Sequence, residues 1–219
     1  EIYADLDHSG RTASISHHYP EGTIVSTGLS KWCGAGGWRL GLFSFPEELE
    51  WLCAAMAVIG TETFTSVSTP IQYAAIRAFE GGPEIEHYVA ACRSILGALG
   101  RHSRATLMAA GCRLARLDGA FYLFPDFEPF REKLAARGVT GSAALAERLL
   151  QDTGVATLPG EVFGRPPGEL NLRLSYVNFD GRAALAAVAA GEPVDDAFLR
   201  RHCPDTLTAI DRMADWTAA

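Results

Sequence analysis

Two short runs of strand-forming residues flank a glycine-rich loop near the start of this chain, and helical patterns follow them. Thr23–Ser26 (TIVS) and Trp38–Phe45 (WRLGLFSF) are rich in the β-branched and apolar residues that buried strands favour. Gly28–Gly37 contains four glycines and is expected to be a loop. A chain that combines strands and helices in this way is predicted to have an α/β fold.

Prolines and glycines then mark where the helices begin and end. A helix is expected from Pro46, and a second begins at Thr69-Pro70, because proline suits the first helical position. Gly81-Gly82-Pro83 interrupts the pattern, and a long helix follows over residues 84–110. Further helices are expected over 128–137, 142–153, 181–190 (capped by Asp180) and in the tail 194–216; strands are expected over 155–158 and 170–177, and a bent strand or hairpin over 113–124. We predict two domains, residues 1–82 and residues 83–219.

Composition narrows the classes of function. The net charge is −7 and the pI is about 5.4, which argues against nucleic acid or an anionic membrane as the main partner. The longest apolar stretch, Trp51–Ile59, is too short to span a bilayer. The five cysteines are widely spaced without a CxxC pair, so we expect reduced thiols, and we expect no metal site, since His17 and His18 are predicted to be a polar loop pair.

The loop carries the residues best suited to chemistry. The chain has two lysines, and Lys31 lies inside this loop, eight residues before Arg39. If both side chains face one pocket, the lysine can form an imine and the guanidinium can hold a dianion with two hydrogen bonds. No GxxxxGK[ST] occurs, and no GxGxxG matches around Gly34–Gly41. The residues alone therefore predict a lysine beside a phosphate-binding arginine.

The segments S-x-x-L-S-K (26–31) and G-W-R-x-G (37–41) resemble the cofactor-lysine signature of class I/II aminotransferases. These are fold-type I enzymes that use pyridoxal 5′-phosphate. Four more segments resemble blocks of that family in the same order: EIYADL (1–6), GAFYLFPDF (119–127), GVATLPGEVFG (154–164) and LNLRLSYV (170–177). The resemblance implies the C-terminal part of a fold-type I transferase. Residues 1–82 would be the remnant of the large cofactor-binding domain, and residues 83–219 a small α+β domain.

The resemblance also implies roles for four residues. Lys31 would be the Schiff-base lysine and would carry the proton at the substrate's α-carbon. Tyr3 would donate a hydrogen bond to the phenolate oxygen of the cofactor, and Arg39 would pair with its phosphate. Arg173 would grip the α-carboxylate of an amino acid or a 2-oxo acid. Each residue also has an ordinary alternative: a solvated loop lysine, a packed tyrosine or a surface arginine.

The sequence motifs indicate the family more clearly than they indicate the reaction. An aminotransferase is the leading hypothesis, a carbon–sulfur β-lyase with the same cofactor is the second, and a non-catalytic ligand-binding or dimerisation module is the third. The segment Thr61–Thr69 has no arginine of the kind that often marks recognition of dicarboxylates. We expect a cytoplasmic protein that forms a homodimer, as the family does.

The first residue raises a further expectation. The chain begins at Glu1, in the middle of a block that in the family includes an aspartate two residues earlier. That aspartate pairs with the ring nitrogen of the cofactor. We therefore expect this chain to be a fragment that is inactive by itself.

Overall fold

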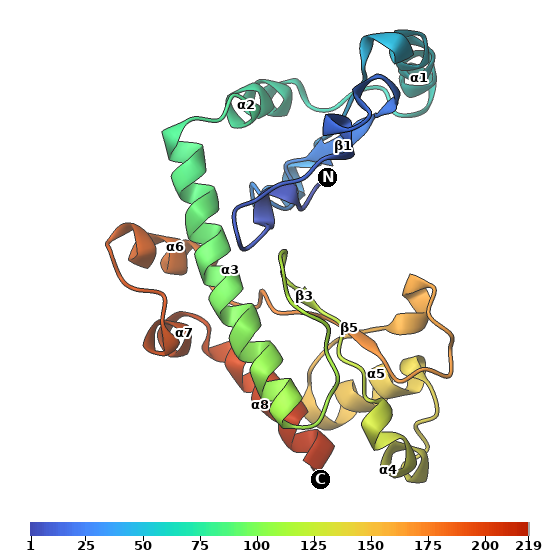
Figure 1. The fold of residues 1–219 in the computed structure, drawn as a ribbon, viewed down its shortest axis with the longest axis vertical. Helices are drawn as coiled ribbons and strands as arrows, with labels where there is room; N and C mark the ends of the chain where they lie inside the picture. The colour runs from blue at the N-terminus through green and yellow to red at the C-terminus, as the bar shows by residue number, and fades with distance from the viewer. Residues whose placement is uncertain (219) are drawn as a thin grey trace. The chain divides into compact units, whose positions relative to one another are not determined.

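The chain folds into two compact units, Glu1–Arg93 and Ser94–Ala219 (Figure 1). The computed structural model describes residues 1–218. The division falls inside helix α3 (Pro83–Ala109), later than the boundary predicted at residue 82. This helix begins at the predicted proline and contributes residues to both units. Each unit is described by itself below.

The first unit contains a two-stranded antiparallel hairpin. Strand β1 (Val25–Gly28) pairs with β2 (Gly41–Ser44), with Gly28 opposite Gly41. Strand β2 begins later than the predicted Trp38, because Gly36–Trp38 forms a 3-10 turn in which the Trp38 amide donates to the Ala35 carbonyl at 3.0 Å. A pair of strands is marginally stable alone and needs packing from other elements.

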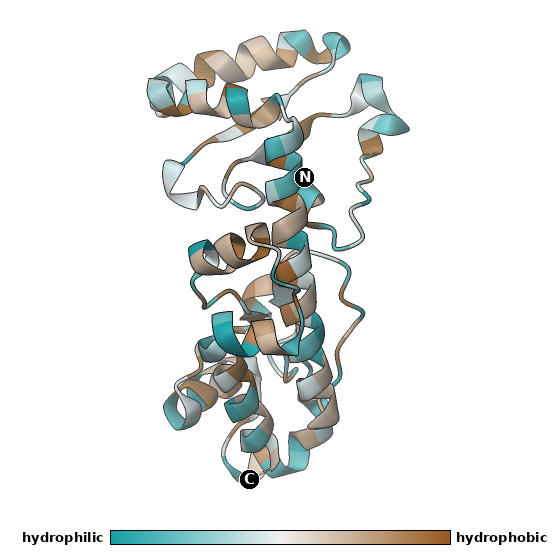
Figure 2. Cartoon of the chain, turned by 90° about the vertical axis from the view of Figure 1, so that its left-hand side faces the viewer, coloured by the Kyte–Doolittle hydropathy of each residue, from teal (hydrophilic) through white to brown (hydrophobic). Residues whose placement is uncertain are grey.

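Helices α1 (Glu50–Thr63) and α2 (Thr69–Phe79) follow the hairpin. The helix expected from Pro46 starts with a 3-10 turn, because Pro46 itself has an extended backbone. Helix α1 contains no buried residue, and brown apolar residues are visible on the helices of the first unit in Figure 2. Large apolar side chains are exposed on or beside α1 and α2: Trp51, Val58, Ile59, Phe64, Tyr73 and Ile76. These two helices therefore present an uncovered apolar surface.

The second unit contains a three-stranded antiparallel sheet. Its strands are β3 (Tyr122–Leu123), β4 (Leu158–Pro159) and β5 (Leu172–Ser175), in the order β3-β5-β4. The expected hairpin over 113–124 is closed by a bridge between Arg113 and Asp126 and is otherwise an open loop apart from β3. The strand expected over 155–158 is wrong except at its last residue, because the Val155 amide donates to the Thr153 hydroxyl rather than to a strand.

The second unit also contains five further helices: α4 (Arg131–Ala136), α5 (Ser142–Thr153), α6 (Gly181–Ala189), α7 (Asp196–His202) and α8 (Pro204–Ala218). The Asp180 carboxylate accepts from the amides of Arg182 and Ala183, which confirms the predicted cap of α6. Helix α5 packs against α8 and against the sheet. Buried side chains from these elements form the core: Leu145, Leu149, Leu172, Leu174, Phe198, Ile210 and Met213.

Candidate active site

The loop that carries Lys31 and Arg39 is closed at one narrow neck. The Leu29 amide donates to the Leu40 carbonyl at 3.3 Å, directly beyond the last pair of the hairpin. A Cβ atom on Gly28 would lie 2.6 Å from the Leu40 oxygen, so only glycine permits this approach of the two chains. Lys31 leaves this neck on one side and Arg39 enters it on the other. The hairpin therefore brings the two predicted residues to the same end of the sheet.

Tyr3 lies beside Lys31. The Lys31 Nζ atom is 5.9 Å from the centroid of the Tyr3 ring, and both residues are half-buried. The segment that holds Tyr3 is fixed by the buried side chain of Leu6 and by Arg93, whose Nε donates to the Asp5 carbonyl at 2.6 Å. The Tyr3 ring and the Lys31 amine thus lie close to each other.

Arg39 occupies a left-handed backbone conformation. Its φ is +55°, a region that costs a residue with a Cβ atom about 1 kcal/mol or more. One of its guanidinium nitrogens, Nη1, donates to the Gly36 carbonyl at 2.8 Å, and the side chain is exposed. The backbone turns the Arg39 side chain back over its own loop. The hydrogen bond to Gly36 uses only one of the guanidinium N–H donors.

The aromatic side chains that pack against the loop were not predicted from the sequence. Trp32 is buried and packs edge-on against Phe79, with ring centroids 5.8 Å apart. A Cβ atom on Gly34 would lie 3.1 Å from the Tyr88 hydroxyl, so α3 supports the other side of the loop. Burial raises the pKa of Tyr88 well above its ordinary value, and the neighbouring Cys92 raises it further. The neutral phenol lies against the loop at Gly34.

Arg173 lies on β5 in the second unit and is held between two aromatic rings. Its Cζ atom is 4.7 Å from the Tyr122 ring centroid and 4.5 Å from the Phe163 ring centroid. Its side chain is half-buried, and among residues 1–218 no hydrogen bond from its guanidinium is seen. A guanidinium that is held beside two rings with its donors unused is suited to an anion that arrives at its N–H edge.

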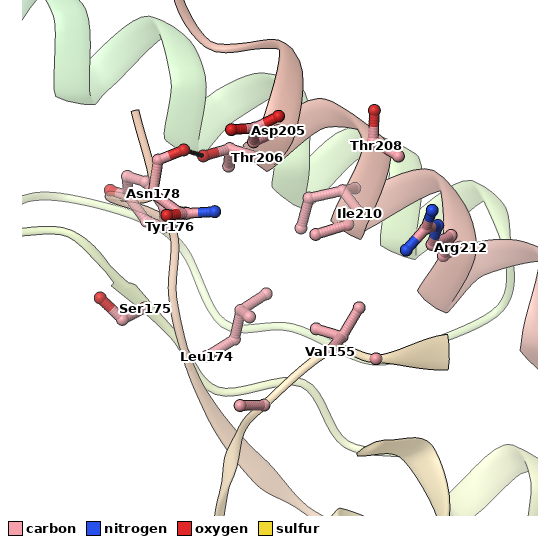
Figure 3. Close-up of a pocket in the computed structure, with 13 residues that line it drawn as sticks. Val155, Leu174, Ser175, Tyr176, Asn178, Asp205, Thr206, Thr208, Ile210 and Arg212 are labelled. Atoms are coloured by element: carbon pink, nitrogen blue, oxygen red, sulfur yellow. Dashed lines mark hydrogen bonds between the residues drawn. The ribbon is translucent and has the colours of Figure 1, made fainter. Parts of the chain in front are cut away.

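A separate cavity of about 420 Å³ lies in the second unit between α8 and the end of β5 (Figure 3). Asp205, Thr208 and Arg212 line it from α8, and Ser175 lines it from β5. Two of its lining residues are joined by a hydrogen bond, which the Thr206 hydroxyl donates to the Asn178 carbonyl at 3.0 Å (Figure 3). None of the predicted site residues lines this cavity.

Two further features are absent from residues 1–218. No helix in this range is long and apolar enough to cross a membrane. No group of three or more histidine, cysteine, aspartate or glutamate side chains in this range is arranged to hold a metal ion. All five cysteines carry free thiols.

Comparison with known proteins places the chain among aminotransferases. The family model described as aminotransferase class I and II matches residues 1–187. A probable aspartate/prephenate aminotransferase of Aquifex aeolicus is 32% identical over 169 residues, which are 75% of this chain and 39% of that protein. An aspartate aminotransferase of Geobacillus stearothermophilus is 33% identical over 181 residues, which are 80% of this chain and 43% of that protein. The chain thus spans less than half the length of these relatives.

Solved structures agree with this placement. A double mutant of Thermus thermophilus aspartate aminotransferase matches with a TM-score of 0.73 and 27% identity, over 98% of this chain and 46% of that one. The aromatic aminotransferase of Pyrococcus horikoshii matches with a TM-score of 0.73 and 26% identity, over 98% of this chain and 49% of that one. These matches confirm the predicted α/β, fold-type I class. The chain belongs to the class I and II aminotransferase family.

Proposed function

We propose that the complete protein is a pyridoxal-phosphate-dependent aminotransferase, which moves an amino group between an amino acid and a 2-oxo acid. The single observation that carries this proposal is the closed loop that brings Lys31 and Arg39 to one end of the hairpin, with Tyr3 beside the lysine. Family membership and the names of the relatives support it.

The donors on this loop fit the cofactor that the family uses. An amine suits the aldehyde group, a phenol suits the phenolate oxygen, and a guanidinium suits the phosphate dianion. In the proposal, Lys31 holds the cofactor covalently, Tyr3 donates to its ring oxygen and Arg39 pairs with its phosphate. The left-handed backbone of Arg39 also fits this role, because strained residues persist where a function keeps them.

Each residue of this chain then has a definite task in catalysis. The bound cofactor supplies an electron sink for the charge that develops at the substrate's α-carbon. Lys31, once displaced from the cofactor by the amino group of the substrate, would take the proton from the α-carbon of the amino acid and, in the reverse half-reaction, deliver a proton to the α-carbon derived from the 2-oxo acid. Arg173 binds the α-carboxylate along its N–H edge and so fixes the orientation of the α-carbon. Tyr3 stabilises negative charge on the ring oxygen.

The organisation of the protein is part of the proposal. Residues 1–82 would belong to the cofactor-binding domain and residues 83–219 to the small domain. The existence of two compact units supports this assignment. A homodimer is proposed because α1 exposes apolar side chains that a second subunit could cover. A cytoplasmic location is proposed because the thiols are free.

The test uses the complete protein that contains this chain, incubated with the cofactor and then reduced with borohydride. Reduction should attach the cofactor to Lys31 and not to Lys133, whose Nζ donates to the carbonyls of Thr217 and Ala218. Peptide mass spectrometry identifies the modified lysine. Attachment at Lys133, or at neither lysine, would overturn the proposal. Amino transfer that requires a 2-oxo acid acceptor would separate this activity from a β-lyase, which needs none.

A further inference from the structure

The rings beside Arg173 come from strand β3 and from the turn that follows strand β4, and these two strands flank β5. Tyr122 pairs with Ser175, so it is the diagonal neighbour of Arg173 on the same face of the sheet. Phe163 ends the 3-10 turn Gly160–Phe163, which follows β4 directly, and β4 places Leu158 opposite Arg173. The antiparallel order β3-β5-β4 therefore brings one ring to the guanidinium from each side.

Further rings support both of these side chains. Phe163 meets Phe124 edge-on at 6.2 Å between centroids, and Tyr122 lies 4.6 Å from the Phe121 ring. Phe163 is nevertheless 42% exposed and Phe124 is 38% exposed, so neither ring is placed there to fill the core. Phe163 is therefore a partly exposed aromatic ring beside a cation, which indicates that its position serves the cation.

Contact with two rings changes what the guanidinium can do. Its rotamers are restricted before a ligand arrives, so less entropy is lost on binding. The rings displace water where they contact the guanidinium, while the N–H donors are kept for an in-plane partner. A planar carboxylate matches that edge with two parallel hydrogen bonds.

We propose that Phe163 and Tyr122 are positioning residues that hold Arg173 ready for the substrate carboxylate. This inference rests on the proposed aminotransferase function. The rings act through Arg173 and do not enter the chemistry. Their loss should therefore weaken the binding of both substrates and leave the rate at saturation nearly unchanged.

The experiment compares steady-state kinetics of variants of the complete, cofactor-loaded protein. Phe163→Leu and Tyr122→Leu should each raise KM for the amino acid and for the 2-oxo acid about five- to thirtyfold, the range of a partly desolvated cation–π contact. The value of kcat should stay within about twofold. Phe163→Tyr and Tyr122→Phe keep a ring and should restore KM. Val162→Ala, on the same turn but 61% exposed, is the matched control and should behave as the parent.

Two further measurements make the outcome decisive. Propionate, which offers a carboxylate without an amino group, should inhibit the leucine variants more weakly by the same factor as the rise in KM. Arg173→Lys tests the proposed function separately, because it removes the planar guanidinium that can bind a carboxylate with two parallel hydrogen bonds. If Arg173→Lys raises KM and the leucine variants do not, the positioning role is wrong and the function stands. If Arg173→Lys leaves KM unchanged, the assignment of Arg173 fails. Leucine variants that lower kcat with KM unchanged would also overturn the positioning role.

Discussion

The indole N–H of Trp216 donates a hydrogen bond to Oδ2 of Asp152 at 2.8 Å, which ties helix α8 to helix α5. The same carboxylate oxygen accepts from Arg137 at 2.7 Å and from Arg148 at 2.9 Å. Arg137 also covers the Trp216 ring, with its Cζ atom 4.4 Å from the ring centroid. One aspartate therefore links an indole and two guanidinium groups at the interface of two helices.

Replacing this tryptophan should cost stability. Trp216→Phe keeps an aromatic ring for Arg137 but removes the N–H donor, so the free energy of unfolding should fall by about 1 kcal/mol. Urea unfolding followed by circular dichroism measures the change. Tyr73→Phe changes an exposed side chain and serves as the control. Equal unfolding midpoints for Trp216→Phe and the parent would show that the hydrogen bond contributes nothing.

The pKa of Asp152 predicts how this link responds to acid. The hydrogen bond from Trp216 lowers that pKa in the folded protein, and Arg148 lowers it further. The unfolded chain then binds the proton more readily, so the stabilisation is complete above about pH 4 and is lost as the pH falls through the folded pKa. The difference in unfolding midpoint between the parent and Asp152→Asn should be constant from pH 7 to 5 and shrink at pH 3. A difference that grows toward pH 3 would contradict this assignment.

Gly160 should not tolerate a side chain. A Cβ atom there would lie 1.6 Å from the Asn171 Oδ1 atom, and Asn171 is buried two residues before Arg173. Gly160→Ala must displace the asparagine or the turn that carries Phe163, and should cost about 1–3 kcal/mol of stability. Gly168→Ala is the control, because a Cβ atom there meets nothing within 4 Å. If both variants unfold at the same urea concentration, the predicted clash is absent.

Arg39 should show opposite effects on stability and on cofactor binding. Arg39→Gly relieves a φ of +55° and should raise the free energy of unfolding of the cofactor-free protein by about 1 kcal/mol. The same change removes the proposed phosphate partner and should weaken pyridoxal phosphate binding at least tenfold, as loss of a charged hydrogen bond does. Arg39→Ala should weaken binding equally without the gain in stability. Cofactor titration followed by fluorescence, together with urea unfolding, tests both halves; unchanged affinity in both variants would exclude the phosphate role.

Local signals in the sequence were sufficient for most helices. The patterns predicted α2 from Thr69, α5 over Ser142–Thr153 and the cap by Asp180 as the structure has them. These features depend on neighbouring residues, so the sequence contains what decides them. The strands were harder, because β4 and β5 pair residues that lie far apart in the chain. Val155 has strand composition, yet a nearby hydroxyl takes its amide.

The candidate site likewise combines features that could be predicted from the sequence with features that could not. The resemblance indicated Lys31, Arg39, Tyr3 and Arg173, and their roles stay predictions. It gave no reason to select Phe163, whose importance depends on a turn that returns it to β5. The left-handed backbone of Arg39 was also not predictable, because nothing in the residue itself favours that conformation.

The closed neck between Leu29 and Leu40 has a consequence for how this protein tolerates change. Residues 29–40 form one closed loop that carries Lys31 and Arg39. Insertions or deletions outside this loop should therefore leave the distance between the two residues unchanged. One residue added inside the loop, however, should change the distance between the Lys31 amine and the Arg39 guanidinium. Length variation among natural or engineered relatives should therefore be found on either side of residues 29–40 and avoided within them.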